Sequence, residues 1–222
     1  MSLTPRAVVL LAALAVAGCG PGDTVDTAPE QPPGAETPTA AVEGLIEAIH
    51  EPDFPAAGRL SVPGQAALAA LAEGATLDEV AESLEADDGQ VSANFWSGFA
   101  QGAGGFLTGD VSAAEDGLVE GDGYQFHSVS VQSADGEPRT LLVRDEDGYR
   151  VDIFASFGPA LADKMIAPVE RLLTTQTEDS RLILNELQAI VPSLLVAASQ
   201  PGTSATASQE IVALVEVITR VR

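Results

Sequence analysis

Residues 141–154 read LLVRDEDGYRVDIF, and this stretch decides the fold that we predict. Apolar and polar residues alternate on both sides of Asp147–Gly148, a pair typical of a tight turn between antiparallel strands. A second cluster of turn-forming residues, SADGEP at 133–138, lies just before this hairpin. The predicted strands are 111–120, 124–132, 139–144 and 149–154. The middle of the chain is therefore predicted to be an antiparallel meander.

Helical periodicity flanks the meander on both sides. Val42, Leu45 and Ile49 recur at helical spacing, and Pro52 and Pro55 are expected to end that helix. The order Thr76-Leu-Asp-Glu79 matches a capping box and predicts the start of another helix. The predicted helices are 41–51, 64–73, 76–86, 91–102, 157–173, 181–198 with an interruption at Pro192, and 208–222.

These elements predict an α+β fold, with N-terminal helices packed on a curved antiparallel sheet of three to four strands. Helices followed by a meander that ends in the run from Asp147 to Asp152 resemble the small NTF2-like lipoproteins, over about residues 41–154. The resemblance implies a pocket between helices and sheet. It does not imply an activity, because one fold hosts enzymes, carriers and scaffolds. The helices of 156–222 are an addition to that pattern, and we expect them to pack on the same domain as residues 41–155.

The N-terminus has the three parts of an export signal. Residues 1–6 are short and basic, and 7–17 form an apolar run that is too short for the ~20 residues of a membrane-spanning helix. Val16-Ala17-Gly18-Cys19 resembles the lipobox of bacterial lipoproteins. That resemblance implies a signal peptide over 1–18, cleavage before Cys19 and a lipid on its sulfur. We therefore expect an exported protein anchored to the outer face of the cell membrane.

Residues 19–40 contain five prolines and one large aliphatic side chain, Val25. Such a segment cannot bury enough apolar surface to offset the entropy of ordering it, so we predict a disordered, acidic tether.

The charge limits the choice of partner. The chain has 33 acidic and 10 basic residues, a net charge of −23. Phosphate backbones require clusters of Lys and Arg, so nucleic acid is excluded as a partner. The membrane, reached through lipid on Cys19, and a protein or an apolar small molecule remain the predicted partners.

Candidate site residues are few. The two histidines, His50 and His127, are too few for a zinc site with several His or Cys ligands, and we expect no metal and no cofactor. His127 could act as a general base if it faces a pocket, and Asp152 could do so if it is buried. A hydrogen-bonded histidine and an exposed strand carboxylate are the simpler interpretations. The candidate ligand-binding aromatic residues are Trp96, Tyr124, Phe126 and Phe154, which would otherwise belong to the core.

Three functions therefore remain open at this point. The first is a non-enzymatic lipoprotein of the cell envelope that acts as a binding or interaction module, with its apolar C-terminal helices as packing or partner surface. The second is an NTF2-like pocket enzyme that uses His127 or Asp152. The third is a carrier of an apolar small ligand.

Overall fold

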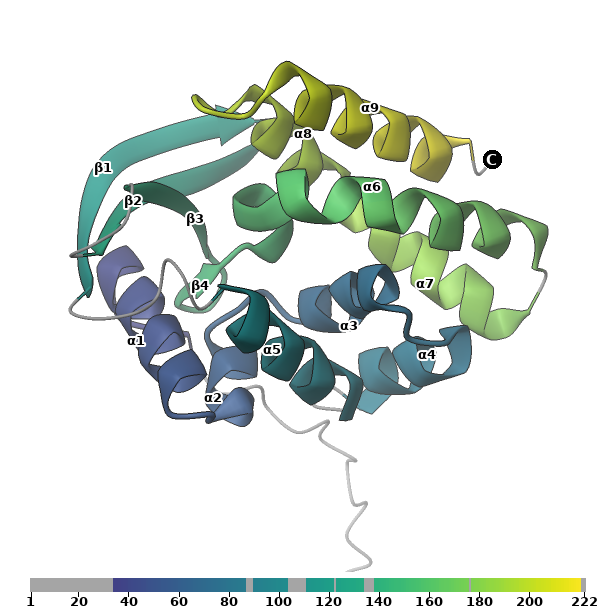
Figure 1. The fold of residues 1–222 in the computed structure, drawn as a ribbon, viewed down its shortest axis with the longest axis horizontal. Coiled ribbons are helices and arrows are strands. Elements are labelled where there is room, and N and C mark those ends of the chain that lie inside the picture. The colour runs from purple at the N-terminus through teal and green to yellow at the C-terminus, as the bar shows by residue number, and fades with distance from the viewer. Residues whose placement is uncertain are drawn as a thin grey trace, which may run out of the picture. The chain divides into compact units, whose positions relative to one another are not determined.

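The computed structural model describes residues 34–86, 90–103, 111–121, 123–133, 138–175 and 177–220, and the α+β class is confirmed in them (Figure 1). The helices that come before the sheet are α1 (Pro38–His50), α2 (Phe54–Arg59), α3 (Gln65–Ala69), the short 3₁₀ helix η1 (Ala70–Glu73), α4 (Leu77–Ala86) and α5 (Gln90–Ala103). The strands are β1 (Val111–Gly121), β2 (Tyr124–Ser133), β3 (Arg139–Asp145) and β4 (Tyr149–Val151). The helices that follow are α6 (Ile153–Thr174), α7 (Glu178–Ala189), α8 (Val191–Ser199) and α9 (Ala205–Thr219).

The four strands form the predicted antiparallel meander in the order β1-β2-β3-β4. Val129 of β2 pairs with Leu141 of β3, and Val143 of β3 pairs with Val151 of β4. The last strand is shorter than predicted. It ends at Val151 because Asp152 is the N-cap of α6, where its side chain accepts a hydrogen bond from Ala155 N.

Segments of this chain that precede the sheet cover the outer edge of β4. Ala35 and Tyr149 exchange two backbone hydrogen bonds, of 2.9 and 2.8 Å. Val62 N donates to Val151 O at 3.0 Å, and Val151 N donates to Leu60 O at 2.8 Å. The predicted tether of 19–40 is therefore too long at its C-terminal end, since Ala35 joins the sheet and α1 begins at Pro38.

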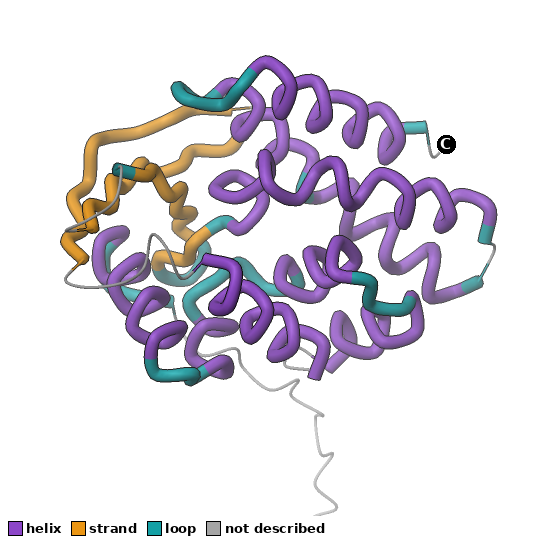
Figure 2. Tube along the Cα trace, viewed as in Figure 1, coloured by secondary structure: helices purple, strands orange, loops and turns teal. Residues whose placement is uncertain are grey.

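Helices pack on both faces of the sheet (Figure 2). One face, which carries Val129, Leu141 and Val143, belongs to the main core together with Val42 and Leu45 of α1. On the opposite face lies a smaller apolar cluster, made by Phe126, Leu142, Ala155 and Val196. The first turn of α6 and the helix α8 thus cover the side of the sheet that α1 does not.

The helix signals of the sequence are mostly confirmed, with two differences. Thr76 and Glu79 form the predicted capping box, with Thr76 N donating to Glu79 Oε2 at 2.8 Å. The hydroxyl and the backbone N–H of Thr76 hold the pKa of Glu79 below its ordinary value. The first difference is α2, which was not predicted. Asp53 caps it through Ala56 N, and Pro55 lies in its first turn, where a missing N–H costs nothing.

The second difference is the start of α6, which begins at Ile153 and not at residue 157. The predicted boundary between the NTF2-like part and the C-terminal helices, at 155/156, therefore falls inside the first turn of this helix. Met165 and Val169 of α6 belong to the same core as α1, so the C-terminal helices are continuous with the rest of the fold. Pro192 does interrupt 181–198, and α7 and α8 meet at a 41° bend. No single helix of the described residues is long and apolar enough to cross a membrane, although α7 and α8 together meet the length and composition required.

Gly121 is required by the contact between β1 and α8, because a Cβ there would overlap with Cγ2 of buried Val196. We expect Gly121→Ala to lower the free energy of unfolding by about 1–3 kcal/mol, the usual cost of overpacking. Gly98→Ala is the matched control. Its Cβ would meet no atom within 4 Å, and it should stabilise α5 by about 0.5–1 kcal/mol. Urea unfolding measures both, and equal effects of the two substitutions would contradict this packing.

Candidate functional site

The alternation of the strands separates the two candidate bases. His127 lies on the face of the sheet that carries Val129 and Val143, because His127 and Val143 are direct partners. Phe126 lies on the opposite face with Leu142. Asp152 directly follows Val151, the last residue of β4, and its side chain points to the opposite face from that of Val151. It therefore lies on the face of Phe126 and Leu142, where it contacts Ser193 of α8. The structure therefore builds two separate polar sites, one around each candidate.

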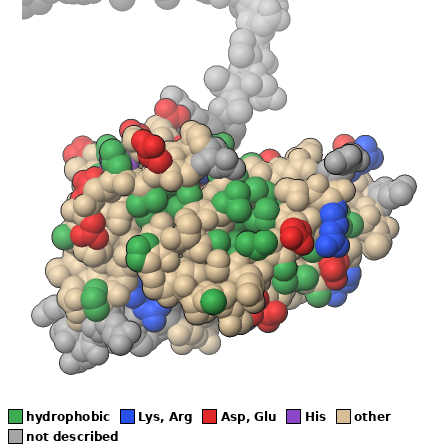
Figure 3. All heavy atoms as spheres, turned by 90° about the horizontal axis from the view of Figure 1, so that it is seen from above, with side chains coloured by type: hydrophobic (Ala, Val, Ile, Leu, Met, Phe, Trp, Pro, Cys, Tyr) green, Lys and Arg blue, Asp and Glu red, His purple; other side chains and the backbone are tan. Residues whose placement is uncertain are grey.

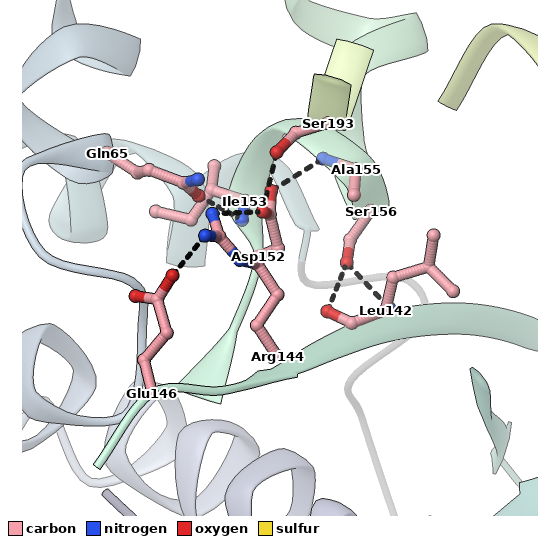
Figure 4. Close-up of polar contacts among 9 residues, drawn as sticks. All are labelled: Gln65, Leu142, Arg144, Glu146, Asp152, Ile153, Ala155, Ser156 and Ser193. Atoms are coloured by element: carbon pink, nitrogen blue, oxygen red, sulfur yellow. Dashed lines mark hydrogen bonds and ion pairs between the residues drawn. The ribbon is translucent and has the colours of Figure 1, made fainter. Parts of the chain in front are cut away.

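Asp152 is completely buried, and donors of the chain itself occupy both of its carboxylate oxygens (Figure 4). Oδ1 accepts from Ala155 N at 2.8 Å, and Oδ2 accepts from the Ser193 hydroxyl at 2.7 Å. The guanidinium of Arg144 lies 3.5 Å from Oδ2. The prediction that Asp152 is an exposed strand residue is therefore wrong. A carboxylate that is completely buried and bonded to donors of its own chain is not accessible to a substrate.

Arg144 connects this buried carboxylate to the surface. Its side chain is 12% exposed, and its second nitrogen, Nη2, forms an ion pair with Glu146. The guanidinium carbon also lies 4.5 Å from the centre of the Tyr124 ring, in a cation–π contact. Asp152, Glu146 and Tyr124 thus hold the arginine in one position, and the charge of the buried carboxylate is compensated.

Gln65 completes the buried cluster from the opposite side. Its Oε1 accepts from Ile153 N at 2.6 Å, which provides a second side-chain acceptor for the first turn of α6. The same turn is tied to β3, because Ser156 exchanges hydrogen bonds with the N–H and C=O of Leu142. Nε2 of Gln65 is buried and has no hydrogen-bond partner in the described part of the chain. Residues 88 positions apart therefore meet at the start of one helix.

Gln65, Arg144 and Ser193 were not predicted from the sequence as members of a site. One signal was present, since an aspartate directly before an apolar helical stripe is the usual start of a helix. The alternation of 149–154 concealed it, because Val151-Asp152-Ile153 fits a strand equally well. Nothing local marks Gln65 or Ser193, which lie on other helices.

His127 is paired across the first hairpin instead of facing a pocket. Its Nδ1 lies 2.7 Å from Oε1 of Glu115, and its ring meets the ring of Tyr149 edge-on at 5.0 Å. The histidine side chain is 19% exposed and the glutamate 40%. This arrangement agrees with the simpler interpretation, a hydrogen-bonded histidine on the packed face of the strand.

Three of the four candidate aromatic residues are divided between two apolar clusters, and the fourth, Tyr124, belongs to neither. Trp96 and Phe154 belong to the main core, and Trp96 lies 5.1 Å from Phe95 and 5.6 Å from Phe99 in edge-to-face contacts. Phe126 belongs to the smaller cluster on the other face of the sheet. These three side chains are buried and packed, whereas Tyr124 is 40% exposed.

Tyr124 lines a shallow hollow of about 360 Å³ at the end of the first hairpin, together with Glu120, Gly121, Gly123 and Gln125. The hollow is wide open and is lined by residues of the hairpin alone, so it is not the pocket between helices and sheet that the NTF2-like resemblance implies.

The apolar stripe of the last helix faces inward. Ile211, Leu214 and Ile218 of α9 are buried, and the helix packs on α6 and α8. Large apolar side chains that stay exposed on these helices are Leu195 at 36% and Val212 at 43%. Figure 3, which looks onto the side of α9, shows apolar side chains near the middle of this face with acidic ones around them. The C-terminal helices therefore serve mainly for packing.

Two further expectations concern metal and lipid. The described residues contain no group of three or more His, Cys, Asp or Glu side chains that could hold a metal ion. Cys19 lies outside the described residues, so its lipidation stays a prediction. Comparisons of the chain with protein-family models, with curated proteins and with solved structures found no match.

The cluster around Asp152 makes a prediction about stability. Asp152→Ala should lower the free energy of unfolding by about 3–5 kcal/mol, because it removes a helix cap and leaves Arg144 without its buried partner. Ser193→Ala should cost about 1–3 kcal/mol, since it takes one donor from a buried oxygen. Glu146→Ala, which removes the partly exposed partner of the same arginine, is the control and should cost about 0–1 kcal/mol.

Chemical denaturation of the three variants measures these differences. If Asp152→Ala were no more destabilising than Glu146→Ala, the carboxylate would not be holding the fold together, and a role in binding or catalysis would have to be considered again.

Proposed function

We propose that this chain is an exported lipoprotein, held to the outer face of the cell membrane by lipid on Cys19, and that its folded part is a non-enzymatic binding or interaction module. The anchor rests on residues 1–19, where a basic start and an apolar run lead into Val16-Ala17-Gly18-Cys19. Two or more acyl chains bind a bilayer stably through their buried CH₂ groups. A protein of net charge −23 would not adsorb to an anionic membrane without such an anchor.

One observation carries the non-enzymatic part of the proposal, and it is the burial of Asp152. The carboxylate that could have served as a base is inaccessible, and Ala155 N, Ser193 and Arg144 engage it. His127, the other candidate, is paired with Glu115. The two groups lie on opposite faces of the sheet and cannot act on one substrate together.

The same packing argues against the carrier. A carrier requires an apolar space between the helices and the sheet, and Val42 and Leu45 of α1 meet Val129 and Val143 there in one buried cluster. Helices before a meander whose last turn is Asp147–Gly148 support the NTF2-like relationship as part of this proposal. The helices α6–α9 would then be an addition that covers the second face.

The lipid anchor is tested with Cys19→Ser. Cys19 is the single cysteine of the chain, so the substitution removes every thiol that could carry lipid. We expect the parent protein, recovered from its own cells, to partition into detergent and to show the added mass of acyl chains. The variant should lack that mass and partition into buffer.

The control is Val25→Thr, a substitution in the predicted tether that leaves residues 16–19 intact. This variant should carry the same acyl mass as the parent and partition into detergent. A parent protein that stays in buffer with a free thiol at Cys19 would refute the anchor, whatever the folded part binds.

A further inference from the structure

The two edges of the sheet differ in whether their outer backbone groups have hydrogen-bond partners. Backbone groups of Ala35, Leu60 and Val62 cover the outer edge of β4. β1, at the other edge, has β2 as its partner strand, and no backbone hydrogen bond of the described residues reaches its outer side. β1 lies at the edge of the sheet (Figure 1) and, with 11 residues, is its longest strand. The run Ala114–Leu118 is exposed throughout. An open edge of this length offers a row of N–H and C=O groups to another extended chain.

The register identifies the groups that point outward. Asp152 N donates to Leu142 O, so Val143, the neighbour of Leu142, directs its own N–H and C=O toward β2. His127 pairs with Val143, and the alternation continues through β2 to β1. The N–H and C=O of Leu118 and Glu120 therefore point away from the sheet, and those of Val119 point toward β2.

The charged side chains along this edge are all acidic, and an exposed apolar side chain lies between them. β1 contains Glu115, Asp116 and Glu120 and no Lys or Arg. Between the acids lies Leu118, which is 54% exposed, the highest value among the large apolar side chains of the described residues. Glu115, Leu118 and Glu120 share the face of His127, because the register pairs Leu118 with His127 and Glu120 with Gln125. An acid, an apolar residue and an acid thus follow one another along the open edge.

We propose that the outer edge of β1 binds an extended, cationic segment of a partner protein, which adds to the sheet as a fifth strand. Its backbone bonds to the outward groups of Leu118 and Glu120. Lys or Arg side chains lie opposite Glu120 and Glu115, and an apolar side chain between them lies on Leu118. The inference rests on the proposed function of the folded part as a binding module, and it names the chemistry of the partner.

Charge favours this occupant over two others. A second copy of the chain would bring the same acids to the edge, and like charges directly opposite each other are destabilising. The segment 19–33 of the same chain contains Asp23, Asp26 and Glu30 and no basic residue, so it is repelled as well. The bulge between Glu115 and Gly117 twists the strand and interrupts the regular ladder, which further disfavours pairing of two identical edges, because both would carry the extra residue.

The probe is the synthetic peptide Thr-Lys-Thr-Val-Thr-Lys-Thr, added to the full chain in a non-ionic detergent. Amide hydrogen exchange read by NMR distinguishes strand addition from loose attraction. The N–H groups of Leu118 and Glu120 should exchange rapidly in the free protein and become protected on binding. Val119 N–H, already bonded to β2, should change little. A peptide with Glu in place of both Lys should bind about tenfold or more weakly.

Matched variants test the residues. Glu120→Lys should weaken binding of the Lys peptide about tenfold, since it places like charges opposite each other. Leu118→Thr should weaken it about two- to fivefold, the range for one cross-strand pair. Glu216→Lys makes the same change of net charge at an exposed position of α9, and it should leave the affinity for the peptide unchanged.

Equal weakening by Glu120→Lys and Glu216→Lys, or binding without protection of Leu118 and Glu120, would overturn the proposal in favour of diffuse electrostatic attraction. Protection that appears with protein concentration in the absence of peptide would assign the edge to a second copy. Failure of the peptide to bind would refute this inference and leave the lipid anchor untouched, because the acyl mass on Cys19 is measured independently.

Discussion

A carboxylate without access to water lies at the point where the sheet meets the C-terminal helices. Burying the charge of Asp152 is unfavourable unless donors surround it, and the donors come from three places in the chain: Arg144 of β3, Ala155 of α6 and Ser193 of α8. Each hydrogen bond therefore requires one more element to be in place. The first turn of α6 in addition binds Gln65 of α3, which brings the N-terminal helices to the same point.

This requirement explains why the chain does not divide at the end of its meander. A sheet with helices on one face leaves its other face to solvent, yet Phe126 and Leu142 on that face are apolar and buried. The first turn of α6 and Val196 of α8 cover them, and α9 packs on both helices. Both faces of the sheet thus carry buried apolar clusters, and Asp152, one of the two candidate bases, connects β3, α6 and α8. The surface we propose for recognition is the outer edge of β1, which no backbone hydrogen bond of the described residues reaches.

The contrast between the two sheet edges has a physical origin. Residues that precede the sheet run along β4 and form hydrogen bonds with its backbone groups. That edge therefore needs no charged side chains to prevent pairing with another chain. Within the described part of the chain the outer edge of β1 stays open, and it bears acids and a bulge, the features that keep open edges from pairing with copies of themselves. The same acids make the edge selective, because a chain of opposite charge meets no such barrier.

The amino-acid sequence by itself determined the local structure. The alternation of β2 and β3, the Asp147–Gly148 turn, the Thr76–Glu79 capping box and the periodicity of α6, α7 and α9 depend on neighbours within a few residues, and they were predicted correctly. Tertiary structure alone decided whether Asp152 would continue a strand or begin a helix, and which side chains would meet around it. Gln65 and Ser193 lie 88 and 41 positions from their partners, and no local pattern records a contact over such separations. A buried charge selects its donors in space, because the free energy of its desolvation depends on what surrounds it and not on what precedes it in the chain.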